Sequence, residues 1–160
     1  MEFLALQSSY SIHYVDVLAN LTKLTSLNMN NCSYLENVNG LTNLTKLTSL
    51  NLSAKGGFSW NTTITNIDVL ANLNNLTDLN LCYYESLQNM DGLVNCTNLT
   101  RLILYGCKSL KNVNGLANLT NISSLNLGYC DKVNPKPSKE VMTIREEVAA
   151  YQQEIKKSMK

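Results

Sequence analysis

The chain has 160 residues and a formal net charge of +1 at pH 7, so its length predicts a single domain. The balanced charge, with no basic block, argues against nucleic acid or an acidic membrane surface as a charge-driven partner. No apolar run approaches the roughly 18–20 residues that span a bilayer, so we expect no membrane insertion. Residues 1–10 lack the basic region and long apolar core of a signal peptide.

Six short segments along the chain share one pattern, in which apolar residues alternate with residues expected to point outward. They recur every 23 residues, except that 29 residues separate the third from the fourth. This alternation is typical of a strand that is buried on one face. One strand per repeat, reached after a long crossover, predicts a parallel sheet. The predicted strand centres are 4–6, 27–29, 50–52, 79–81, 102–104 and 125–127.

Leucine recurs at every third residue before each strand, as at Leu18, Leu21 and Leu24. Such spacing differs from the 3.6-residue period of a long amphipathic helix and is typical of short 3₁₀ turns. Turn-forming pairs such as Asn39-Gly40 mark the entry into this segment. We therefore expect a 3₁₀ or irregular segment to face the sheet in every repeat.

The combined pattern, as in ITNIDVLANLNNLTDLNL over residues 64–81, resembles the short internalin-type leucine-rich repeat of bacteria. The residues after the strand resemble those of cysteine-containing repeats, with Cys32, Cys107 and Cys130 in one column. The resemblance covers residues 4–133. It implies an α/β fold: a curved, right-handed leucine-rich-repeat solenoid with one parallel sheet on its concave side. Such repeats host unrelated functions, so the resemblance implies no particular activity.

Two segments depart from the repeat. An insertion at residues 54–63 carries Phe58 and Trp60 between a strand and its return segment. We predict that the solenoid of about six units occupies residues 1–133, and that a proline-containing linker and an amphipathic helix occupy residues 134–160.

The predicted C-terminal helix follows two prolines that prevent another regular turn. Ser138 is the expected N-cap of a helix over residues 139–157. One face of this helix is apolar and comprises Val141, Ile144, Val148, Tyr151 and Ile155. We expect the helix to cover the last repeat, because a terminal repeat otherwise exposes its apolar side. The alternative is that the apolar face pairs with another chain.

The predicted binding surface is the concave face of the sheet. Side chains between the strand leucines, and at the two positions after them, are expected to point there. These positions hold small polar residues in the first half of the chain and aromatic or charged residues in the second. Tyrosine and arginine often dominate interface energy. The predicted partner-binding residues are Asp78, Tyr83, Arg101, Ile103, Tyr105 and Tyr129, with Phe58 and Trp60 overhanging them. The alternative is that the aromatic residues only cover the sheet and pack on their own loop.

The sequence predicts no catalytic, metal or cofactor site. His13 is the only histidine, and the five cysteines include no CxxC pair. Catalysis by Cys82 would need a neighbouring base, which its repeat and the adjacent repeats do not supply as histidine. We expect Cys82 to be accessible and the other thiols to be buried and reduced.

Asn-x-Ser/Thr sequences recur in register, as at Asn20 and Asn43. We interpret them as filler residues of the repeat rather than as glycan acceptors. Together with the reduced thiols, this favours a reducing cytoplasmic location. A secreted or cell-surface bacterial location is the alternative.

Two hypotheses of function follow. The first is a non-catalytic scaffold that binds a protein partner on the concave face. The second is a structural module that self-associates through the C-terminal helix or through the open first strand at residues 3–6, an unprotected sheet edge. An enzyme is the least favoured class, because no phosphate loop, paired-carboxylate motif or nucleophile–base pair is present.

Overall fold

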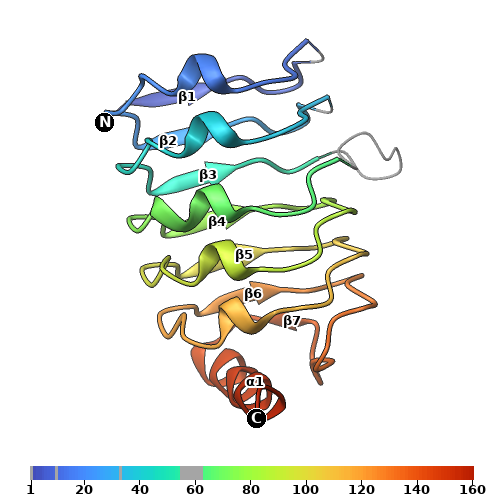
Figure 1. Ribbon diagram of the computed structural model, residues 1–160. Helices are drawn as coiled ribbons and strands as arrows, with labels where there is room; N and C mark the ends of the chain where they lie inside the picture. The colour runs from blue at the N-terminus through green and yellow to red at the C-terminus, as the bar shows by residue number, and fades with distance from the viewer. Residues whose placement is uncertain (1, 10, 33, 55–62) are drawn as a thin grey trace.

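The computed structural model describes residues 2–9, 11–32, 34–54 and 63–160, which form a stack of coils with one strand in each coil (Figure 1). The sheet has the order β1-β2-β3-β4-β5-β6-β7. Its parallel strands are β1 (Phe3–Ala5), β2 (Ser26–Asn28), β3 (Ser49–Asn51), β4 (Asp78–Asn80), β5 (Arg101–Ile103) and β6 (Ser124–Asn126). The 3₁₀ turns on the opposite side are η1 (Asp16–Leu18), η2 (Asn39–Leu41), η3 (Asp68–Asn72), η4 (Asp91–Leu93) and η5 (Asn114–Leu116). The predicted leucine-rich-repeat solenoid is confirmed.

The strand register follows the repeat. Leu27 of β2 pairs with Leu50 of β3, and Leu50 pairs with Leu79 of β4 although 29 residues separate them. The longer spacing therefore leaves the sheet register unchanged. Most of the insertion lies outside the described residues.

The core is a continuous column of aliphatic side chains that neighbouring coils share. Leu79, Leu102 and Leu125 point inward from consecutive strands and are almost fully buried. A coil cannot bury this face alone, so the stacking itself creates the core.

Close approach of the coils explains the glycine in most 3₁₀ turns. A Cβ atom on Gly40 would lie 2.1 Å from the carbonyl oxygen of Val15 in the preceding coil. Valine takes the equivalent position in η1 and η3, as Val17, which is 84% exposed, and Val69, which is partly buried.

The C-terminal segment corrects one prediction. The helix α1 spans Arg145–Ser158, and its N-cap position is Ile144 rather than Ser138. Before it, β7 (Val141–Met142) pairs antiparallel with β6. The N–H of Leu127 donates to the carbonyl of Glu140 at 2.7 Å. Closing the sheet edge satisfies backbone groups that would otherwise be unpaired, and this outweighs the local helix preference.

The predicted apolar face of the helix is therefore only partly correct. Val148, Tyr151 and Ile155 are buried on the last coil, whereas Val141 and Ile144 precede the helix and are about half exposed. These three buried side chains belong to the same core as the repeats. The domain boundary at residue 133 remains a prediction. Within the described chain, no helix has both the length and the apolar character needed to cross a membrane.

Candidate interaction surface on the concave face

Asparagine occupies the position between the strand leucines in most coils, and its side chain is used locally. Each Oδ1 atom accepts a hydrogen bond of 2.9–3.1 Å from the backbone N–H two residues later. This local turn is a common role of asparagine. The asparagines concerned are Asn28, Asn51, Asn80 and Asn126. Their acceptor oxygens are thus already engaged in shaping the coil.

Ile103 interrupts this asparagine column and places an apolar side chain on the concave face. In the sheet register it pairs with Asn80 on one side and Asn126 on the other. Beyond Asn126 the register continues to Val141 of β7, which is 44% exposed. Cross-strand partners share one face of a sheet, so Val141 extends the concave surface. Val141 was not predicted to lie on this face, because its spacing also fits a helix.

Two opposite charges lie beside Ile103. Asp78 and Arg101 are direct partners in the β4–β5 register. The hydroxyl of Thr77 donates to Oδ2 of Asp78 at 2.9 Å. Among the described residues the ion pairs are His13–Glu36, Lys108–Glu85 and Lys139–Glu147, so Asp78 and Arg101 do not close onto each other. The two side chains line a hollow of about 320 Å³ together with Ser49, Asn51, Asn80 and Ile103.

Three tyrosine rings form a ladder at the ends of the last parallel strands. We call Tyr83, Tyr105 and Tyr129 the tyrosine ladder. The ring centroids of Tyr83 and Tyr105 are 5.4 Å apart, and those of Tyr105 and Tyr129 are 5.0 Å apart. Interplanar angles of 81° and 66° give the edge-to-face arrangement that aromatic pairs favour. The structure therefore brings all three predicted tyrosines together, although none of them lines the hollow.

Glycine of the following coil makes room for each of the first two rings. A Cβ atom on Gly106 would lie 2.7 Å from Cδ1 of Tyr83. A Cβ atom on Gly128 would lie 2.9 Å from Cδ2 of Tyr105. This role of the two glycines was not predicted, although the order Tyr105-Gly106 in one coil is reversed to Gly128-Tyr129 in the next.

The ladder lies outside the core. Tyr129 is 60% exposed, and Tyr83 and Tyr105 are half-buried against their neighbours. Burial, followed by the proximity of Tyr129 and Tyr83, raises the pKa of Tyr105. A tyrosine hydroxyl is protonated at neutral pH, and it can both donate and accept a hydrogen bond.

Phe58 and Trp60, the other two predicted binding residues, lie outside the described residues. Their place above the concave face remains a prediction.

The cysteines behave largely as expected for small core residues. Cys32, Cys107 and Cys130 donate from Sγ to carbonyl oxygens at 3.0–3.3 Å. Burial raises the pKa of Cys96 to about 11. Cys82 is half-buried rather than fully accessible, and burial raises its pKa as well, so its reactive thiolate is scarce at neutral pH.

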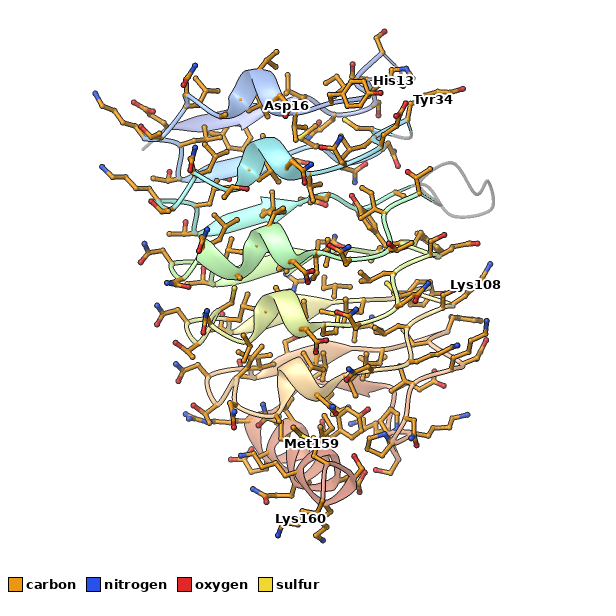
Figure 2. The ribbon with its side chains drawn as sticks, viewed as in Figure 1. His13, Asp16, Tyr34, Lys108, Met159 and Lys160 are labelled. Carbon is orange, nitrogen blue, oxygen red and sulfur yellow. The ribbon has the colours of Figure 1, made fainter. Side chains whose placement is uncertain are left out.

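His13 lies at the N-terminal end of the solenoid, beside Tyr34 (Figure 2). Its Nδ1 is 3.1 Å from Oε1 of Glu36, and both side chains are about half exposed. Within the described part of the chain, no group of three or more His, Cys, Asp or Glu side chains could hold a metal ion.

Comparison with solved structures gives matches to other leucine-rich repeat proteins. An internalin (InlF) from Listeria monocytogenes is 24% identical, with a TM-score of 0.56, over 83% of this chain and 46% of the internalin. Internalin C2 from the same organism is 22% identical, with a TM-score of 0.46, over 83% of this chain and 69% of its own. The leucine-rich repeat domain of the type III effector XopL is 18% identical, with a TM-score of 0.48, over 86% and 64%. The chain thus spans about half the length of InlF, and the likeness to InlF shows the fold.

No curated protein matches the sequence. The family of Zer-1-like leucine-rich repeats matches residues 67–153, which is more than half of the 160 residues. This segment contains the coils that carry Asp78, Arg101 and the tyrosine ladder. The match and the coil geometry together show that the chain belongs to the Zer-1-like leucine-rich repeat family.

Proposed function

We propose that this chain is a non-catalytic scaffold that recognises a protein partner with the concave face of its last three parallel strands. The tyrosine ladder is the observation that carries the proposal. It places aromatic rings outside the core, on a face whose asparagines are already engaged in local turns. Exposed tyrosines beside an arginine are typical of surfaces that dominate binding energy.

The tyrosine ladder is also preorganised for binding. Each ring is already held by a neighbouring ring, and Tyr83 and Tyr105 also pack against a glycine in the next coil. A partner that docks on it therefore orders few additional side-chain torsions, which lowers the entropic cost of association. Tyrosine adds apolar area and a hydroxyl that can form hydrogen bonds.

Leucine-rich repeat domains are typically interaction modules rather than enzymes, and this family membership supports a binding role. The chemistry of Cys82 agrees with such a role. Its raised pKa disfavours the thiolate that nucleophilic catalysis requires.

The proposal predicts that Tyr129→Ala weakens partner binding with little loss of stability, because the ring is exposed but lies on the proposed surface. A displayed library of random linear peptides supplies ligands selected on the unchanged chain. We expect Tyr129→Ala to weaken their affinity by about tenfold or more, the loss typical of a dominant interface residue.

The matched control is Tyr14→Ala. This tyrosine is 55% exposed, and its hydroxyl donates to Glu36 at 2.8 Å, near the N-terminal end of the stack. It should leave peptide affinity unchanged. Equal effects of the two substitutions would contradict a concave binding surface, and a large fall in the melting temperature for Tyr129→Ala would assign that ring a structural role.

Self-association is a second candidate, and the exposed first coil favours one version of it. In the sheet of the described residues, strand β1 pairs with β2 alone, and the exposed fractions of Phe3 and Leu21 are 61% and 41%. The C-terminal helix is less suited, because its apolar face is buried. Sedimentation velocity over a range of concentrations tests this candidate. Association that Phe3→Lys abolishes would support it, whereas a constant monomer mass would exclude it.

A further inference from the structure

A pair of opposite charges marks the centre of the concave face. Asp78 and Arg101 are partners across β4 and β5. The corresponding position is serine in the other parallel strands from β2 onward, namely Ser26, Ser49 and Ser124. The strands with serine at this position pair in the same register, so the sheet itself does not require the two charges.

Both charges remain available. Arg101 is exposed, and its guanidinium forms no hydrogen bond or ion pair with a described residue. The hydrogen bond from Thr77 engages Oδ2 of Asp78 and leaves Oδ1 without a described partner. A surface ion pair between neighbours gains little energy in water, so the open arrangement costs the free protein little.

The same charges matter more beneath a partner. Docking excludes water from the hollow of about 320 Å³, and charge interactions strengthen as the effective dielectric constant falls. Each charge then needs an opposite charge, because an unpaired buried ion is unfavourable. Arginine adds directional selectivity, since its guanidinium matches a carboxylate with two parallel hydrogen bonds.

We propose that Asp78 and Arg101 bind two neighbouring, oppositely charged side chains on the protein partner. A carboxylate of the partner binds Arg101, and a lysine or arginine of the partner binds Asp78. Ile103 provides apolar contact beside them, within the same hollow. This inference rests on the proposed function, and it specifies the orientation of the partner on the concave face.

Exchanging the two charges provides the test. The double variant Asp78→Arg/Arg101→Asp keeps the composition and net charge of the chain, and the neutral pair Asp78→Asn/Arg101→Gln serves as a second variant. Circular dichroism checks that both are folded. The probes are peptides selected from a displayed random library on the unchanged chain, together with synthetic copies in which acidic and basic residues are exchanged.

We expect the selected peptides to bind the charge-exchanged variant at least about fivefold more weakly, a loss within the range for partly desolvated pairs. The charge-exchanged peptides should recover that loss on the charge-exchanged variant but not on the neutral pair. Weakening without recovery would overturn the proposal. Unchanged affinity for all variants of this pair, with a loss on Tyr129→Ala, would overturn the charge pairing and leave the proposed function standing. If Tyr129→Ala also left the affinity for the peptides unchanged, both the charge pairing and the proposed function would be overturned.

Discussion

Tyr105 packs on Gly128 of the next coil, and this contact joins the tyrosine ladder to the backbone. A Cβ atom on Gly128 would lie 2.9 Å from Cδ2 of Tyr105, which is too close for the ring to keep its position. The ladder is therefore a packed structure rather than three independent surface residues.

A double-mutant cycle measures this packing. Gly128→Ala should lower the free energy of unfolding by about 1–2 kcal/mol, as overpacking typically does. In the Tyr105→Ala background the same change should cost clearly less, because the ring is absent and the remaining close neighbour of the methyl group is Oδ1 of Asn126 at 3.2 Å. Urea denaturation of the four proteins gives the coupling. Equal costs in both backgrounds would show that the ring does not rest on Gly128.

The tyrosines of the ladder could be predicted from the sequence, but the glycines that they pack against could not. The period of the repeat assigned Tyr83, Tyr105 and Tyr129 to neighbouring coils. The role of Gly106 and Gly128 depends on distances between coils, which a one-dimensional pattern does not contain. Likewise, the sequence places Asp78 beside Arg101, but whether they close into an ion pair depends on side-chain torsions.

The C-terminal helix covers the last coil with more than its apolar residues. Gln152 is buried, and its Nε2 donates to the carbonyl oxygens of Leu116 and Leu119, both at 2.9 Å. The hydroxyl of Tyr151 donates to the carbonyl of Pro135 at 2.7 Å. These bonds satisfy polar groups where the stack of coils ends.

Replacing Gln152 tests this role of α1. Gln152→Leu should lower the free energy of unfolding by about 1–3 kcal/mol, because two buried hydrogen bonds are lost. Gln153→Leu is the matched control, since Gln153 is the exposed neighbour, and it should change the free energy by less than about 0.5 kcal/mol. A similar effect of both substitutions in urea denaturation would contradict the proposed contacts.

The elements of the repeat were predictable, and the element that closes the stack was not. Strands and 3₁₀ turns recur with the leucine period, so every coil supports the same assignment. The segment Val141–Met142 is a strand only because the edge of β6 offers hydrogen bonds to it. Its spacing fits a helix equally well, so a sequence pattern alone favours the wrong element.

At the scale of the whole molecule, one core runs through the coils and includes Val148, Tyr151 and Ile155 of α1. The helix lies at the end of the stack, next to the last coil (Figure 1). The leucines that build the core recur in every coil, which is why the architecture could be predicted. The residues proposed for binding instead differ from coil to coil and concentrate on β4, β5, β6 and the loops that follow them. The proposed function therefore rests on departures from the repeat on an exposed face.

Tyrosine-selective NMR tests the central claim most directly. The chain is prepared with ¹³C-labelled tyrosine rings, and each signal is assigned by substitution. Adding the tightest peptide selected from the random library should shift the ring signals of Tyr83, Tyr105 and Tyr129 and leave those of Tyr14 and Tyr34 unchanged. Shifts confined to Tyr14 and Tyr34, or no shift in the tyrosine ladder under saturating peptide, would contradict binding on the concave face.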